Sequence, residues 1–312
     1  MRYGEDKRDQ LKSGLSSYSL NIEALPGVQT EVRLSTYVDQ LIDSLRRVHY
    51  VQKISKMDHD HRRKDPSDPM FDPLKAAILQ HREGNVDEAF WLVFLATHFG
   101  RHVVDGWRLA RDIYGKYGAA GTWCWNSISV DPEGVSVWLT EVEDELQKDG
   151  VNRRFGNHRK YETLKTSSAR GTGKVLESYV RWVGQNRGHE LLLSEVQGDG
   201  QQDPGALFDT LYSQMGQVVS FGRTGRFDYL TMLGKIGLAD IEPRIPYLAG
   251  ATGPLRGARL LLDNNPTSST SAAVLNEKIR QLGLHLEVGM QVMEDSLCNW
   301  QKSPETFIHF GG

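Results

Sequence analysis

The segment that most constrains the fold is an almost uninterrupted apolar run, EAFWLVFLATHFG, at residues 88–100. A helix built from this run is apolar on nearly every face, so other elements must surround it. The rest of the chain carries further helical patterns and no recurring alternation of the kind that strands show. The sequence therefore predicts an all-α fold with this helix at its centre.

The other helices are predicted from apolar spacing and from capping signals. Asp131 followed by Pro132 opens one of them, since proline suits the first helical position. The remaining patterns lie at residues 35–54, 72–82, 85–118, 131–147, 172–184, 203–219, 239–249, 254–263, 271–283 and 287–302. Residues 1–34 mix glycine, serine, proline and charge without a sustained period. We therefore expect a flexible N-terminal arm over 1–34 and one helical domain over 35–312.

Composition excludes several classes of protein. The chain has 312 residues and only two cysteines, Cys124 and Cys298, too few for a disulfide scaffold or for the roughly four ligands of an iron–sulfur cluster. No apolar run approaches the ~20 residues that span a membrane, and the polar N-terminus lacks the apolar core of a signal peptide. We expect a cytoplasmic protein with no membrane association, no structural metal and no cofactor.

The charge distribution indicates a local basic patch although the net charge is −3. Residues 121–150 hold seven acidic side chains and one basic, whereas residues 151–190 hold nine lysines and arginines against three glutamates. Such a concentration suits contact with phosphates, and the alternative is a set of scattered, solvated surface charges.

Two phrases of similar form, FGNHRKYE (155–162) and FGRTGRFD (221–228), combine glycine, basic and aromatic residues. This mixture is suited to gripping phosphate and stacking on a base, although a chance likeness over eight positions stays open. From these phrases and the residues around them we predict DNA contacts by Arg153, Arg154, Arg159, Lys160, Arg223 and Arg226.

A glycine-rich corner, Gly250-Ala251-Thr252-Gly253-Pro254, separates two runs with helical spacing. A helix-hairpin-helix at about 240–263 would use Gly250 and Gly253 to bring backbone amides close to a phosphate. Arg256 and Arg259 on the second helix would add positive charge. The alternative is a plain turn between helices in which a glycine ends the first.

Longer phrases resemble a known family. Residues 88–115 and 274–300 resemble the opening and closing helices of helix-hairpin-helix DNA glycosylases. WLVFLATHFG, RRFGNHRKYE and LCNWQKSPETF resemble the alpha-glutamyl/putrescinyl thymine pyrophosphorylase family, clade three, of that superfamily. The resemblance covers about residues 35–310. It implies an all-α, helix-hairpin-helix DNA-glycosylase-like domain with an N-terminal helical extension.

The resemblance implies two kinds of reaction on hypermodified bacteriophage DNA. The family name implies that an amine displaces pyrophosphate from a diphosphorylated hydroxymethyl base. Relatives in bacterial defence loci imply excision of a bulky base, such as glucosylated hydroxymethylcytosine, to leave an abasic site. Both reactions require the base to be flipped out of the duplex.

The catalytic carboxylate of the glycosylases has no counterpart in this sequence. A nearby carboxylate stabilises the oxocarbenium charge that develops on the sugar, and in the glycosylases an Asp beyond the hairpin supplies it. The matching stretch, PTSSTSAAVLNEK, starts without Asp. Asp263 is the nearest replacement, although it could equally be a solvated acid at a helix end. Asp112 is more simply explained as a partner of Arg108 or Arg111.

Further candidates come from the polar residues of the matching phrases. Asn157 and His158 are predicted to take part in catalysis, by reading a base edge and by moving a proton or contacting phosphate. A base pocket is predicted from His98, Arg101, His102, Trp300 and Lys302. The alternatives are an exposed loop for His158 and a buried core position for the tryptophan. No Glu follows His98 as a metal-binding H-E-x-x-H motif requires, and DHDH (58–61) is interpreted as a solvated linker.

The predicted function is therefore an antiphage DNA glycosylase that flips and excises a hypermodified base. Pyrophosphate displacement and DNA binding without catalysis are the alternatives. The predicted partner is double-stranded DNA with modified bases, with no obligate protein partner.

Overall fold

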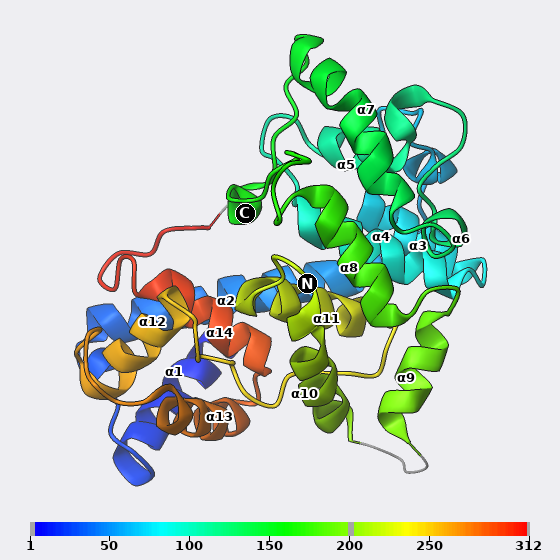
Figure 1. The fold of residues 1–312 in the computed structure, drawn as a ribbon. Helices are drawn as coiled ribbons and strands as arrows, with labels where there is room; N and C mark the ends of the chain where they lie inside the picture. Colours follow the sequence, from blue (N-terminus) through cyan, green and yellow to red (C-terminus); the bar gives the residue numbers. More distant parts are fainter. Residues whose placement is uncertain (1–3, 199–202, 311–312) are drawn as a thin grey trace. The chain divides into compact units, whose positions relative to one another are not determined.

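The computed structural model describes residues 4–198 and 203–310, and these residues form helices and loops without a β-strand (Figure 1). The predicted all-α class is confirmed. The chain divides into two compact units, one formed by the residues up to Lys53 together with those from Pro243 onward, and the other formed by Ile54–Glu242. The single domain predicted over 35–312 is therefore divided, because the first unit is built from both ends of the chain.

The first unit packs five α-helices around one core. They are α1 (Glu5–Asn21), most of α2 (Glu31–Ile54), α12 (Gly253–Asp263), α13 (Ala272–Leu286) and α14 (Met290–Trp300), with a short 3₁₀ turn at Pro26–Val28. Each contributes fully buried residues to the core, among them Leu15, Leu41, Leu261, Leu282 and Trp300. The N-terminal and C-terminal segments of the chain thus share one hydrophobic interior.

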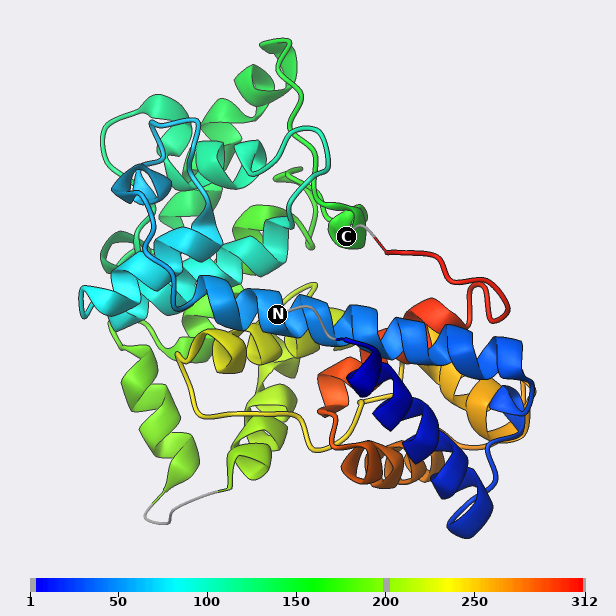
Figure 2. The same ribbon diagram turned by 180° about the vertical axis from the view of Figure 1, so that it is seen from behind.

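The flexible arm expected over residues 1–34 is wrong, because α1 occupies half of it. Leu11, Leu15 and Tyr18 lie four and three residues apart on one face of this helix and are buried. Arg8 donates to Asp39 of α2 at 2.8 Å, and α1 begins beside α2 and then runs away from it at an angle (Figure 2). The apolar stripe is narrow and surrounded by charge, which hides the period in a sequence average.

The second unit is built around the apolar helix. It contains α3 (Pro73–Arg82), α4 (Val86–Phe99), α5 (Arg108–Tyr114), α6 (Trp125–Ile128), α7 (Gly134–Lys148), α8 (Thr172–Val183), α9 (His189–Gln197), α10 (Pro204–Gln214) and α11 (Arg223–Ile236). Every residue of α4 from Ala89 to Leu95 is buried. Phe94 stacks on Tyr179 of α8 with 3.7 Å between ring centroids. The predicted central position of α4 is confirmed.

The first helix of the predicted hairpin does not form. Residues 239–249 have no helical conformation, and only α12 follows the glycine-rich corner. Pro243 and Pro246 explain the difference, since each lacks the N–H that a helix interior needs and restricts the residue before it. The helix-hairpin-helix expected at about 240–263 is therefore reduced to its second helix.

The glycines of α12 serve packing between helices. A Cβ on Gly253 would lie 2.7 Å from Sγ of Cys298, and one on Gly257 would lie 2.2 Å from the carbonyl oxygen of Leu297. Both contacts are with α14, so these glycines let the two helices approach closely. Gly250 has a φ of +75°, which accounts for glycine at that position of the turn. The corner thus has structural reasons for its glycines.

If α1 belongs to the core, shortening one of its buried side chains will destabilise the protein. Leu15→Ala should lower the free energy of unfolding by about 2–5 kcal/mol, because it leaves a cavity. Leu20 on the same helix is 85% exposed, so Leu20→Ala should change it by less than about 0.5 kcal/mol. Urea unfolding of both variants measures the difference, and equal effects would show that α1 is not packed.

Candidate functional site

Two phrases that lie more than 50 residues apart cross at a pair of glycines. The N–H of Gly156 donates to the carbonyl oxygen of Phe99 at 2.8 Å. A Cβ on Gly156 would lie 2.8 Å from the carbonyl carbon of Gly100, and Gly100 has a φ of +62°. Only glycine suits both positions, because the backbones touch and one is left-handed. The crossing holds the residues after α4 beside residues 153–160.

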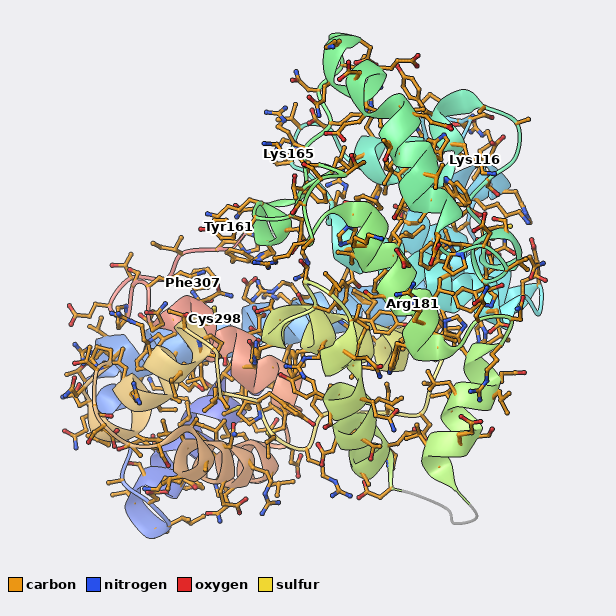
Figure 3. The ribbon with its side chains drawn as sticks, in the orientation of Figure 1. Lys116, Tyr161, Lys165, Arg181, Cys298 and Phe307 are labelled. Carbon is orange, nitrogen blue, oxygen red and sulfur yellow. The ribbon has the colours of Figure 1, made fainter. Side chains whose placement is uncertain are left out.

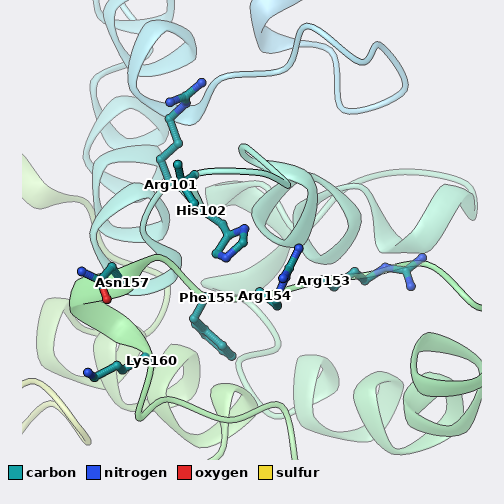
Figure 4. A pocket seen from close by; sticks show the side chains of 8 residues that line it. Arg101, His102, Arg153, Arg154, Phe155, Asn157 and Lys160 are labelled. Carbon is teal, nitrogen blue, oxygen red and sulfur yellow. The ribbon is translucent and has the colours of Figure 1, made fainter. Parts of the chain in front are cut away.

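A pocket of about 570 Å³ lies at this crossing (Figure 4). Eight residues line it: Arg101, His102, Val103, Arg153, Arg154, Phe155, Asn157 and Lys160. We call it the basic pocket. Six of the eight are sequence-predicted site residues, so the fold brings the DNA-contact and base-pocket candidates of this unit together. Val103 and Phe155 were missed because apolar side chains carry no chemical signal in a sequence.

The four cations of the basic pocket are not equivalent. Arg153 is 5% exposed and bonds to Asp149 at 2.6 Å and to Asp112 at 2.7 Å. The hydrogen bond to Asp149 is the largest cause of its raised pKa. Arg101 and Lys160, by contrast, are exposed and have no carboxylate partner within residues 4–198 and 203–310. These two side chains carry the charge available to a ligand.

Arg154 is intermediate between these cases. Its guanidinium is half exposed and bonds to the buried carboxylate of Asp105 at 2.7 and 2.9 Å. This bond lowers the pKa of Asp105, which keeps that side chain ionised. One edge of Arg154 is therefore occupied within the protein.

The amide and imidazole side chains differ in their placement. Asn157 is exposed and lines the pocket (Figure 4), whereas the exposed His158 beside it does not line it. Nδ1 of His102 accepts the N–H groups of Val104 and Asp105 at 3.3 and 3.1 Å. The neutral ring therefore carries its proton on Nε2. Asn157 and His102 thus offer hydrogen-bonding groups at the pocket.

His98 was predicted to line the base pocket, and this is wrong because it is 1% exposed. Its Nε2 lies 3.1 Å from Oγ1 of Thr172, whose single proton goes to the carbonyl oxygen of Thr163. Nε2 must therefore donate, which leaves Nδ1 as a buried acceptor without a donor among the described residues. Burial lowers the pKa of His98 to about 3. The centroid of the His98 ring lies 5.7 Å from that of Phe155, so the buried imidazole packs edge-on against a residue that lines the basic pocket.

The two similar phrases meet through their basic and acidic positions. Arg159 donates to the carbonyl oxygen of Thr97 at 2.7 Å and pairs with Asp228 at 2.9 Å. Arg226 donates to the carbonyl oxygen of Tyr212. These bonds occupy Arg159 and Arg226 within the fold, so the expected DNA contacts are corrected to structural roles. The sequence suggests that both arginines are exposed. Their side chains are long enough, however, to reach backbone carbonyl groups inside the fold.

Several candidates of the first unit also have structural partners. Trp300 is fully buried and lies 5.0 Å from the ring of Tyr37, so the base-pocket role predicted for it is wrong. Arg259 donates to the carbonyl oxygen of Thr270 at 3.1 Å, which ties α12 to the loop before α13. Lys302 donates to Asn299 at 2.9 Å.

The remaining candidates are one cation in each unit and the acid Asp263. Arg256 is exposed on α12. Arg223 lies with its guanidinium 4.7 Å from the ring centroid of Phe227. Asp263 ends α12 and accepts the hydroxyl of Ser268 in the following turn. It is partly buried.

Two acids of the second unit complete the description. Asp112 pairs with Arg111 and Arg153, in agreement with the structural role that the sequence favoured for it.

Glu162 was not among the residues that the sequence singled out. Its Oε2 is buried with no hydrogen-bond donor among the described residues, and burial raises the pKa of this carboxyl. The sequence could not predict the raised pKa of Glu162, because that shift depends on the burial of the side chain in the folded protein.

Within the part of the chain that the structure describes, no three His, Cys, Asp or Glu side chains are arranged to hold a metal ion. None of the helices there is long and apolar enough to cross a bilayer.

The buried neutral state of His98 predicts an acid-sensitive stability. The pKa of about 3 lies below the unfolded value near 6.5, so the unfolded chain binds the proton more readily and stability falls as the pH drops below 6.5. Between pH 7 and pH 5 the native protein should lose about 2 kcal/mol more than His98→Gln. Urea unfolding at both pH values measures this, with His61→Gln as an exposed control. Equal losses in native protein and His98→Gln would contradict the burial of a neutral ring.

Comparison with known proteins identifies the same family that the phrases at the crossing resemble. A family model described as alpha-glutamyl/putrescinyl thymine pyrophosphorylase clade 3 matches residues 32–312. No curated protein and no solved structure matches the chain. The match spans both compact units and includes every residue of the basic pocket. The chain belongs to the alpha-glutamyl/putrescinyl thymine pyrophosphorylase family, clade 3.

Proposed function

We propose that this protein acts on a modified base of double-stranded DNA, and that it excises the base. The observation that carries the proposal is the basic pocket, which gathers exposed cations, an amide and an aromatic ring at one crossing of the chain. The family supports a substrate that contains a modified thymine or a related base. A cavity of about 570 Å³ lies within the range of small-molecule sites.

Each lining residue has a role in this proposal. Arg101 and Lys160 contact phosphates, since their charges have no carboxylate partner in the described chain. Phe155 offers a face for stacking on the extruded base, and the Asn157 amide can both donate to and accept from its edge. His102 donates from Nε2. Together these residues would hold a flipped base and the backbone next to it.

None of the described residues that line the basic pocket has a carboxylate to stabilise charge on the sugar. Two exposed or partly exposed acids are the candidates for this role. Asp263 was predicted from the sequence, and it ends α12 in the first unit. The side chain of Asp228 on α11 is 44% exposed and pairs with Arg159, which belongs to the segment 153–160 beside the basic pocket. Excision requires one such carboxylate, so the two acids are tested in parallel.

Pyrophosphate displacement is the second candidate, and one observation favours it. Arg101 and Lys160 line the basic pocket without a carboxylate partner, and none of the described residues that line it is acidic, an arrangement that suits the diphosphate of a diphosphorylated hydroxymethyl base. In that reaction an amine attacks the methylene carbon of the base, the carbon–oxygen bond breaks and pyrophosphate leaves.

The basic pocket should account for a measurable part of DNA affinity. Replacing Arg101 and Lys160 together with alanine should weaken binding of duplex DNA by roughly tenfold or more and reduce the salt slope by about two, since each lost phosphate contact releases one counterion fewer. Lys148 on α7 is 72% exposed and pairs with Asp144, so Lys148→Ala serves as control. Fluorescence anisotropy over a salt series measures both quantities. An unchanged slope in the double variant would place the DNA elsewhere.

Product analysis distinguishes the reactions. DNA carrying glucosylated hydroxymethylcytosine or hydroxymethyluracil should yield free modified base and abasic sites if the protein excises, whereas DNA with ordinary bases should yield neither. Diphosphorylated hydroxymethyluracil DNA with putrescine should instead release pyrophosphate if the second candidate holds. Binding without either product would leave a DNA-binding protein and contradict the enzyme assignment.

The carboxylate is identified in the same assay. Asp263→Asn or Asp228→Asn should abolish release of the base while DNA binding survives, because the substitution keeps shape and removes charge. Asp144→Asn on the exposed face of α7 is the matched control. Full excision by both variants would exclude both acids.

A further inference from the structure

The turn after α4 carries two exposed valines in succession. Val103 is 82% exposed and Val104 is 74% exposed. A single exposed apolar residue on a surface needs no explanation, but two adjacent ones form an apolar tip in water. This tip stands beside the basic pocket, because Val103 lines it. The proposed function gives neither valine a role.

The turn that presents these valines is held at both ends. The N–H of His102 donates to the carbonyl oxygen of Gly106 at 3.0 Å, and the N–H of Gly106 donates to the carbonyl oxygen of His102 at 2.9 Å. Inside the turn, Nδ1 of His102 accepts the N–H groups of Val104 and Asp105. Valine adds stiffness of its own, because its branched Cβ restricts rotation about χ1. The two side chains are therefore fixed in solvent and lose little conformational entropy when they contact a ligand.

Free cations accompany the apolar tip. Arg101 directly precedes the turn and Lys160 lines the same pocket, and neither has a carboxylate partner in the part of the chain that the structure describes. An apolar tip beside such cations fits a polymer with its charge outside and its apolar faces inside. Duplex DNA is built in this way, with phosphates along each strand and stacked bases between them.

Tyr161 is a competing candidate for contact with the bases. It is 84% exposed and projects from the loop that follows residues 157–159 (Figure 3). Its ring, however, is not part of the lining of the basic pocket, and its centroid lies 5.3 Å from Nζ of Lys160. The position of Val103 at the pocket favours the valines, and Tyr161 serves as a comparison.

We propose that Val103 and Val104 enter the base stack of duplex DNA and occupy the space that the flipped base leaves. Apolar side chains suit this role, since they contact the faces of the neighbouring bases after the stacking is lost. The inference rests on the proposed function in one respect, that DNA binds at the basic pocket. It holds for excision and for pyrophosphate displacement alike, because both need the base outside the duplex.

The fluorescence of 2-aminopurine measures the opening of the stack. The probes are duplexes in which 2-aminopurine is the neighbour of glucosylated hydroxymethylcytosine or of hydroxymethyluracil. The native protein should raise the fluorescence of one of them, because 2-aminopurine loses a stacking partner. Val103→Ser with Val104→Ser, the serine variant, should reduce this rise by roughly half or more, while duplex affinity stays within about fivefold because the phosphate contacts remain. Val103→Leu with Val104→Leu keeps the apolar character and should keep the rise.

A mismatched duplex separates this role from a structural one. A modified base opposite a mismatched partner is already poorly paired, so opening it needs less help. The serine variant should therefore come within about twofold of the native protein on that duplex, whereas a distorted pocket would be defective on both. Val130 in the loop before α7 is 60% exposed, and Val130→Ser is the matched control that should behave as native on both duplexes. Thermal melting checks the fold of each variant.

Several outcomes would overturn the inference. They are a native protein that binds the duplexes without raising the fluorescence, a full rise with the serine variant, and a rise that is lost in Tyr161→Ala alone. If the serine variant lost binding to vesicles of phosphatidylserine and phosphatidylcholine but kept the rise, the tip would belong to a membrane contact instead. Absence of any duplex binding by the native protein would refute the proposed function, and this inference with it.

Discussion

The contact between Gly100 and Gly156 is the constraint on which the candidate site depends. Two backbones touch there, and a methyl group at either position would meet main-chain atoms. Because they touch, the short loop after α4 and the basic segment at 153–160 form the walls of a single pocket. The apolar character of α4 matters for the same reason. Because α4 is buried on nearly every side, packing fixes the position of its C-terminal end and therefore that of Gly100, which follows it.

Charge pairing inside the fold decides which cations remain for a ligand. The nine lysines and arginines of residues 151–190 look equally available in the sequence. In the structure, however, Arg153 and Arg159 are bound by carboxylates and carbonyl groups. These bonds hold their guanidinium groups within the fold and leave little of their charge available to a ligand. Arg101 and Lys160 keep theirs. A local excess of lysine and arginine therefore overstates the positive field that DNA would meet.

The sequence predicted what depends on local spacing and missed what depends on long-range packing. The all-α class and the central α4 follow from apolar periodicity. The six predicted residues of the basic pocket come from the local excess of basic residues, from the two similar phrases and from the family resemblance. The burial of His98 and Trp300 was missed, because nothing local distinguishes a buried polar ring from an exposed one. The helix at 239–249 was predicted from its apolar spacing, and its two prolines prevented it. The helix at 5–21 was not predicted, because only three of its residues are buried and they give a weak periodic signal.

The central claim is that a DNA base enters the basic pocket and lies against Phe155. Photo-crosslinking tests it directly, with a duplex that carries 5-iodouracil in place of the modified base and with mass spectrometry to locate the adduct. The account predicts an adduct on Phe155 or on a neighbouring residue of the pocket, and its loss in the Arg101→Ala, Lys160→Ala protein. An adduct confined to the first unit, such as residues 250–263, would contradict it.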